Sequence, residues 1–103
     1  MILNYLENRK NISAIFIAVD IRRGIGDLDK SMIELCENYK IKINIIMTKS
    51  DKVTNSEKFI MKKKAQEEIC GYNNIENIIT FSAKNGEGVK DALDIIEKLN
   101  NKN

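Results

Sequence analysis

Polar residues that could bind a ligand follow two apolar runs of this 103-residue chain. Thr48-Lys-Ser-Asp51 comes directly after the run at 43–47, and Ser82-Ala-Lys84 comes directly after the run at 78–81. In sheets of parallel strands, ligands bind beyond the carboxyl ends of the strands, where such residues gather. The hydroxyl, ammonium and carboxylate groups of the two segments therefore predict a binding site at one rim of a sheet.

Each segment also has a simpler interpretation when it is taken alone. Lys and Asp are common in this chain, and a Thr-Lys-x-Asp tetrapeptide is most often a solvated turn. The glycine-rich stretch at 82–88 could serve only to cap the helix that follows it. The conjunction favours a binding site, because both segments lie at strand ends, in this order, with a capped helix between them.

Other residues that could carry chemistry have structural explanations. Asp27 and Asp29 could suggest paired carboxylates, but residues two apart on a helix face different directions, so we expect Asp27 to cap a helix. Cys36 and Cys70 have no His anywhere in the chain, which excludes a Cys–His nucleophile and a Cys/His metal site. Both cysteines are expected to be small buried hydrophobic residues in a reducing compartment.

The apolar pattern places these segments in an alternating α/β chain. Short β-branched runs at 13–19, 43–47 and 78–81 are typical of strands buried on both faces. Helices are expected at 2–7, from Asp27, from the capping box Thr54-Asn-Ser-Glu57 to about Gly71, and after Gly88. Strands joined by helices run parallel. We therefore predict one α/β domain over residues 1–103, with a three-stranded parallel sheet and flanking helices.

The apolar stripes of the three longer helices follow the helical period. They are Leu28, Met32, Leu35, Cys36 and Tyr39 in the first, Met61, Ala65, Ile69 and Tyr72 in the second, and Val89, Leu93, Ile96 and Leu99 in the last.

Composition limits the classes of function. The chain is 43% hydrophobic and 31% charged, as in globular proteins, and a net charge of +2 does not by itself indicate a nucleic-acid or membrane partner. No stretch approaches the ~18 apolar residues of a membrane span, and no apolar signal-peptide core follows Met1. We expect a soluble, cytoplasmic protein with no membrane partner, or an organelle-matrix protein if the source is eukaryotic.

The two polar segments resemble the base-recognition motifs of GTP-binding proteins, the [NT]-K-x-D and S-A-K loops. This resemblance implies that Asp51 accepts the N1–H and the N2 amino group of guanine as a charge-assisted pair, which adenine cannot offer. Lys49 would lay its alkyl stem along the purine, and the backbone N–H of Ala83 would donate to O6. Thr48 and Ser82 would hold the two loops together. The predicted guanine-binding residues are Thr48, Lys49, Asp51, Phe81, Ser82 and Ala83.

The flanking sequence resembles the EngB group of the translation-factor-like GTPase superfamily over almost the entire chain. The matching residues are Asp20-Ile-Arg22 after the first strand, then Asp27-Leu-Asp29 and Met32-Ile-Glu34 in the next helix. Arg23-Gly-Ile-Gly26 replaces the short Pro-containing loop that is usual in the family. The resemblance implies the C-terminal half of a P-loop G domain, with GTP or GDP as ligand.

For the intact protein, the resemblance implies GTP hydrolysis, a role in large ribosomal subunit assembly and a requirement in normal cell division. Lys58 and the lysine run at 62–64 could contact ribosomal RNA, although such a run is more often a solvated helix face. Ribosomal contact is therefore an expectation for the intact protein.

The phosphate-binding half of a G domain is not recognisable. Residues 1–103 contain neither G-x-x-x-x-G-K-[ST] nor D-x-x-G, so we predict no catalytic and no metal-binding residue. Mg²⁺ is expected only in the intact family member, and the missing N-terminal half would be a partner of this chain. Two hypotheses follow: a fragment or truncated product of an EngB-like GTPase, or a nucleotide-free α/β interaction module derived from a G domain.

Overall fold

The computed structural model describes the backbone of residues 14–101 and the side chains of residues 14–98. Strands and helices alternate in the order β1 (Ala14–Asp20), α2 (Asp27–Asn38), β2 (Lys42–Thr48), α3 (Asn55–Glu68), β3 (Ile75–Thr80) and α4 (Val89–Asn101). A short 3-10 helix, η1 (Ser50–Lys52), lies between β2 and α3. The predicted helical piece at 2–7 and residue 13 of the first predicted strand lie outside the described residues.

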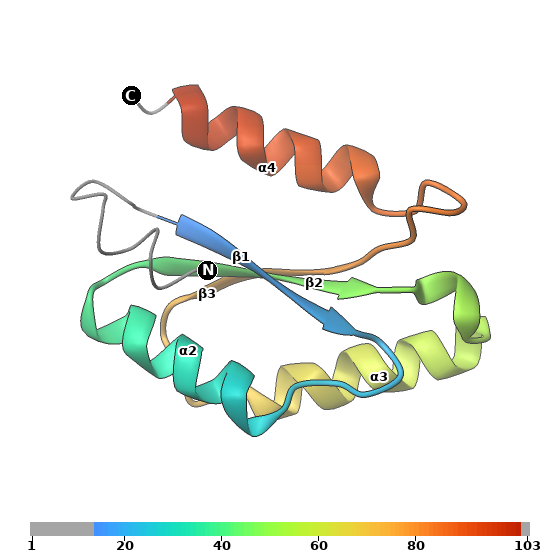
Figure 1. The fold of residues 1–103 in the computed structure, drawn as a ribbon, viewed down its shortest axis with the longest axis horizontal. Helices are drawn as coiled ribbons and strands as arrows, with labels where there is room; N and C mark the ends of the chain where they lie inside the picture. The colour runs from blue at the N-terminus through green and yellow to red at the C-terminus, as the bar shows by residue number, and fades with distance from the viewer. Residues whose placement is uncertain (1–13, 102–103) are drawn as a thin grey trace.

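The three strands form one parallel sheet in the order β1-β2-β3, which confirms the predicted α/β fold. Helices α2 and α3 cover one face of this sheet, and α4 lies on the other (Figure 1). Parallel strands joined by helices place all three carboxyl ends at the same rim. The two polar segments singled out from the sequence therefore leave the sheet side by side.

The main core lies between the sheet and the α2/α3 layer. Successive strand residues point to opposite faces, so every second residue of β1 and β2 enters this core. The buried members are Ile15, Ile17, Val19, Ile43, Ile45 and Met47 from the strands, and Ile33, Cys36, Ala65 and Ile69 from the helices or their ends. β2 is the central strand and is buried on both faces, so the loop that follows it leaves the middle of the rim.

The ends of the elements agree with the sequence to within three residues. β1 and β2 differ from prediction by one residue at each described end, whereas β3 begins at Ile75, three residues early. The capping box of α3 is confirmed: the Glu57 backbone N–H donates to Thr54 Oγ1 over 3.1 Å, and the Thr54 N–H donates to Glu57 Oε1 over 2.8 Å. α3 ends at Glu68, before the predicted stop at Gly71.

The start of α2 corrects the predicted cap. Gly26 is the N-cap and Asp27 the first helical residue, while Asp29 Oδ2 accepts the Gly26 N–H over 2.9 Å. Asp29 therefore does the capping that was expected of Asp27. Leu28, predicted on the apolar stripe, is 87% exposed, because it lies roughly 140° around the helix from the buried Ile33.

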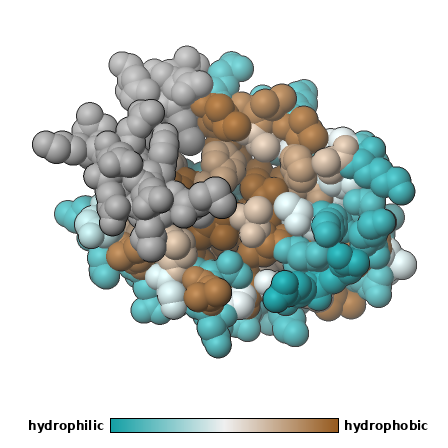
Figure 2. Space-filling view, viewed as in Figure 1, coloured by the Kyte–Doolittle hydropathy of each residue, from teal (hydrophilic) through white to brown (hydrophobic). Residues whose placement is uncertain are grey.

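Several apolar side chains that were expected to be buried are exposed. Tyr39 at the end of α2 is 65% exposed, since the helix has already ended there. Leu93 and Ile96 of α4 are 59% and 43% exposed. Figure 2 shows hydrophobic residues gathered between α4 and the sheet on the visible face. In the described part of the chain, α4 thus leaves part of its apolar stripe uncovered.

The two cysteines differ in environment. Cys36 is buried in the core, and burial raises the pKa of its thiol, whereas Cys70 is exposed just after α3. The prediction that both are buried is therefore wrong for Cys70, which lies beyond the last buried residue of α3's stripe. Among the described helices, none is both long enough and apolar enough to cross a membrane.

Candidate functional site

The loop after β2 is folded back toward the end of β3. Lys49 adopts a left-handed conformation (φ 61°) directly after the strand, and η1 begins at the next residue. The backbone N–H of the buried Ser50 then donates to the Phe81 carbonyl over 3.0 Å, and the Phe81 N–H donates to the Met47 carbonyl over 2.8 Å. These backbone bonds hold the two predicted base-recognition loops against each other.

A side-chain hydrogen bond joins the key residues of the two loops. Ser82 is fully buried, and its Oγ donates to Asp51 Oδ1 over 2.8 Å. The same oxygen accepts the backbone N–H groups of Lys84 and Asn85, each over 3.2 Å. The Ser82 hydrogen bond lowers the pKa of Asp51 below its ordinary value. Asp51 therefore presents a fixed, ionised carboxylate.

A shallow cleft of about 490 Å³ lies where these loops meet. Its volume falls within the ~300–1,000 Å³ that is usual for small-molecule sites. The lining residues are Thr48, Lys49, Asp51, Lys52, Phe81, Ala83 and Lys84. The structure therefore brings together five of the six predicted residues at one cleft. Ser82, the sixth, lies behind it and fixes Asp51.

No family model matches the chain. A protein of Rickettsia prowazekii described as "Probable GTP-binding protein EngB" is 37% identical over 91 residues, which cover 88% of this chain and 42% of that protein. The corresponding protein of Thermotoga petrophila is 34% identical over 99 residues, or 96% of this chain and 50% of that protein.

Two solved structures of a translation elongation factor resemble the chain. The apo form of elongation factor SelB from Methanococcus maripaludis superposes with a TM-score of 0.78 at 24% identity, covering 89% of this chain and 21% of that one. SelB in complex with the GTP analogue GppNHp gives a TM-score of 0.77 at 25% identity, over 87% of this chain and 20% of that one.

The chain is a partial G domain of the EngB type. It spans about half the length, or less, of the curated relatives that it matches. The resemblance drawn from the T-K-x-D and S-A-K loops is confirmed at the level of the family. The roles of single residues in the EngB-type cleft stay predictions.

One role expected from the resemblance is corrected by the structure. Thr48 was expected to hold the two EngB-type loops together, but its Oγ1 donates to the Val19 carbonyl of β1 over 3.1 Å. The reason is register, since Thr48 pairs with Asp20 and so lies beside the end of β1. Of Thr48 and Ser82, it is Ser82 that joins the loops through its side chain, by its bond to Asp51.

Lys49 lies near a second acidic residue at the rim. Its Nζ is 3.9 Å from Asp20 Oδ2, and Lys49 remains mostly exposed. Asp20 is held more tightly by Arg22, whose backbone N–H and guanidinium donate to it over 2.9–3.1 Å. These hydrogen bonds lower the pKa of Asp20 well below its ordinary value. The D-I-R segment of the EngB-type chain thus forms a small local ion pair beside the cleft.

Glu87 is a residue of the site that sequence reasoning missed. Its carboxylate accepts hydrogen bonds from Ser50 Oγ, Lys58 Nζ and Thr80 Oγ1 over 2.6, 2.8 and 2.9 Å. Lys58, Ser50 and Thr80 together lower the pKa of Glu87 to about 2. The only signal in the sequence was its position between Gly86 and Gly88, which by itself indicates no more than a turn.

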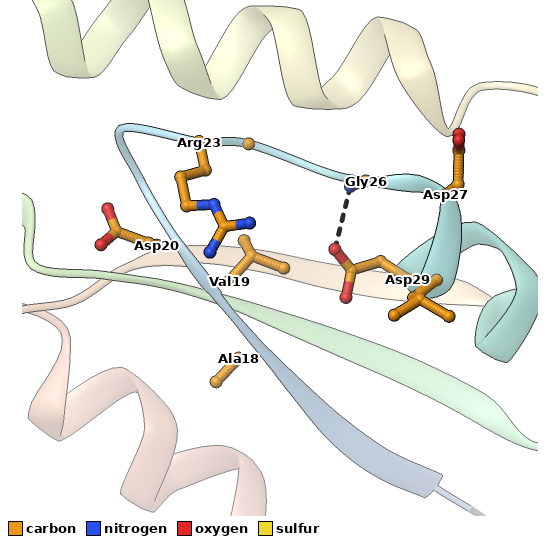
Figure 3. Close-up of a pocket in the computed structure, with 9 residues that line it drawn as sticks. Ala18, Val19, Asp20, Arg23, Gly26, Asp27 and Asp29 are labelled. Atoms are coloured by element: carbon orange, nitrogen blue, oxygen red, sulfur yellow. Dashed lines mark hydrogen bonds between the residues drawn. The ribbon is translucent and has the colours of Figure 1, made fainter.

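A second hollow, of about 460 Å³, lies beside the end of β1 (Figure 3). Arg23 points into it between Asp20 and Asp29, as the close-up shows. Both carboxylates already have other partners, Arg22 for Asp20 and the Gly26 N–H for Asp29. Within the described residues, no group of three or more His, Cys, Asp or Glu side chains could hold a metal ion.

Proposed function

We propose that this chain binds the base of guanine nucleotides in the cleft between the T-K-x-D and S-A-K loops. The observation that supports the proposal best is the fixed carboxylate of Asp51, held by the buried Ser82 over 2.8 Å at the wall of the cleft. An ionised carboxylate accepts two hydrogen bonds, and guanine offers two adjacent donors at N1 and N2. Adenine has an acceptor at N1 and no amino group at C2.

The other lining residues support the same ligand. The alkyl stem of Lys49 and the ring of Phe81 are the apolar surfaces that a purine would contact. Ala83 has no long side chain, so its backbone N–H can approach O6. EngB relatives are named as GTP-binding proteins, and the structural neighbour SelB was solved with a GTP analogue, which supports a guanine nucleotide as the ligand class.

The affinity of residues 1–103 alone is expected to be weak. No P-loop motif is present in these residues to bind the phosphates, so the base contacts must offset the ~4 kcal/mol or more that association costs. We expect a Kd no better than about 1 mM, similar for GMP and GTP, and no measurable GTP hydrolysis.

The test is an NMR titration of the ¹⁵N-labelled chain with GMP and, separately, with AMP. GMP is expected to shift the amide signals of Asp51 and Ala83, and AMP is expected to leave them unchanged. Glu68→Gln, which removes an ion pair with Lys30 at the opposite end of α3, serves as a control that should retain the GMP response. Equal responses to GMP and AMP would contradict guanine recognition.

The finer functions implied by the EngB resemblance are proposals for the longer protein. They comprise GTP hydrolysis with Mg²⁺, assembly of the large ribosomal subunit, a requirement in cell division and a cytoplasmic location. Mg²⁺ is usually held by one or two carboxylates together with waters and the phosphates of the substrate, so its binding is proposed only together with a nucleotide. Co-sedimentation of the longer protein with purified large ribosomal subunits, with GTP or GDP present, tests the ribosomal role.

A nucleotide-free interaction module is the second candidate. The exposed side chains of Leu93 and Ile96 favour it, because contiguous apolar surface often marks a protein–protein contact. The two candidates differ in the GMP titration. An interaction module would give no base-specific shifts in the cleft and would remain a monodisperse, cooperatively folded monomer without nucleotide.

A further inference from the structure

The carboxylate of Glu87 joins three separate segments behind the cleft. Glu87 lies in the loop between β3 and α4. Its Oε1 accepts from Ser50 of η1 and from Lys58 of α3, and its Oε2 accepts from Thr80 at the end of β3. Each of these donors belongs to an element that borders the cleft or supports it. One side chain thus connects both base-recognition loops to the helix that follows the first of them.

The loop that carries Glu87 is closed on itself by its backbone. The Ser82 N–H donates to the Glu87 carbonyl over 3.0 Å, and the Gly86 N–H donates to the Ser82 carbonyl over 2.9 Å. The Glu87 N–H donates to Asn85 Oδ1 over 2.9 Å. Because these bonds link residues 82 and 87 directly, a displacement of Glu87 displaces Ser82 with it.

We propose that Glu87 is a positioning residue for the guanine-binding cleft. Its carboxylate fixes the loop at 82–88 against η1, so that the Ser82 hydroxyl reaches Asp51 and holds it ionised at the cleft wall. Glu87 does not line the cleft, so its effect on the ligand passes through Ser82 and Asp51. This inference rests on the proposed function, because the residue that it positions is the one proposed to bind guanine.

The electrostatics of the site support this role. Lys58 contributes most to the low pKa of Glu87, and its own side chain is about one-quarter exposed, so the ion pair is partly shielded from solvent. A pKa of about 2 keeps Glu87 ionised at any pH near neutrality. A neutral isostere cannot reproduce the arrangement, because an amide offers one acceptor oxygen where the structure uses two.

The test compares Glu87→Gln with Glu68→Gln in the full chain. Both wild-type glutamates pair with a lysine over 2.8 Å, but Glu68 is the last residue of α3, and neither it nor its partner Lys30 lines the cleft. The readouts are the pKa of the Asp51 carboxyl, followed by ¹³C NMR, and the Kd for GMP. For Glu87→Gln we expect the Asp51 pKa to rise toward its ordinary value and GMP affinity to fall about threefold to tenfold. Glu68→Gln should change neither.

Two results would overturn the inference: an unchanged Asp51 pKa and GMP affinity in Glu87→Gln, or equal changes in Glu87→Gln and Glu68→Gln. If Glu87→Gln does not fold, Lys58→Gln is measured in its place. This variant removes the hydrogen bond that contributes most to the low pKa of Glu87, and the same two results would overturn the inference. An Asp51→Ala arm separates the two proposals. Unchanged GMP affinity in Asp51→Ala contradicts the proposed function. The pKa of Asp51, measured in Glu87→Gln, still reports whether Glu87 positions Ser82.

Discussion

Replacing Gly88 by alanine should disturb the base-recognition loop, mainly through a steric clash with the backbone of β3. Gly88 has φ +79°, and a Cβ placed there would lie 2.3 Å from the Thr80 carbonyl oxygen, 3.0 Å from Ile79 Cγ2 and 3.3 Å from Phe81 Cα. The first contact is with backbone, which cannot move aside without shifting the end of β3. Gly86 provides a matched control, because it has φ +85° and no atom within 4 Å of the corresponding Cβ.

The difference between the two variants isolates the clash. The left-handed conformation costs an alanine ~1–2 kcal/mol at either position, and the reduced entropy of the unfolded chain offsets ~0.4–1 kcal/mol of that. Gly86→Ala should therefore lose about 1 kcal/mol of unfolding free energy. Overpacking adds ~1–3 kcal/mol in Gly88→Ala, which at ~4–8 °C per kcal/mol lowers its melting temperature at least several degrees further.

Thermal unfolding followed by circular dichroism measures this difference, and the GMP titration shows whether the loop has moved. Gly88→Ala should also weaken GMP binding, because the loop that holds Ser82 is anchored at residue 88. Equal melting temperatures for the two variants would refute the close approach of residue 88 to β3, and with it the reasoning from backbone contact.

Three further predictions follow from buried or edge positions. The pKa of Glu87 is about 2 instead of 4.5, so its stabilising effect is present above pH 4.5 and is lost as pH falls toward 2. In acid titrations, Glu87→Gln should therefore reduce the dependence of the unfolding free energy on pH between those two values. Asn44→Leu should raise the unfolding free energy by about 1 kcal/mol in urea, because Asn44 Nδ2 is buried without a partner among the described residues, and Asn77, which donates to Asn44 Oδ1 over 2.8 Å, is exposed and can bond to water instead. A loss of more than 1 kcal/mol would contradict this. The chain should self-associate through the edge strand β1 in sedimentation velocity runs, and Ala18→Lys, at an exposed position of that strand, should suppress the association; a wild-type monomer at every concentration would contradict it.

The parts of the fold that could be predicted depend on local patterns. Four of the five residues at 43–47 are apolar because β2 is buried on both faces, and Asn44 is the one polar residue among them. The Thr54–Glu57 capping box fixes the start of α3 by hydrogen bonds within four residues. That the segments of Asp51 and Ser82 share one rim followed from the parallel strands, whose carboxyl ends lie at the same edge of a sheet.

The parts that could not be predicted depend on contacts between distant residues. Leu28 fits a helical stripe by spacing, but which face of α2 is buried is decided by the sheet, through Ile33 and Cys36. The partners of Glu87 lie 7 to 37 positions away in the chain, so no local pattern indicates them. The bond from Thr48 to Val19 likewise depends on the register of β1 against β2.

The central claim is that Asp51 reads the guanine base, and Asp51→Asn tests it most directly. The new amide retains an acceptor for N1–H but presents an N–H₂ group where guanine has its own amino group, whereas the 2-oxo group of xanthine can accept from that amide. Hydrogen bonds to a charged group contribute ~1.5–3 kcal/mol, so the ratio of GMP to XMP affinity should fall at least tenfold. The measurement is the pair of Kd values for GMP and XMP, taken by NMR titration of the wild-type chain and of Asp51→Asn. A reversal of preference toward XMP is expected, and an unchanged ratio of the two Kd values would contradict guanine recognition by Asp51.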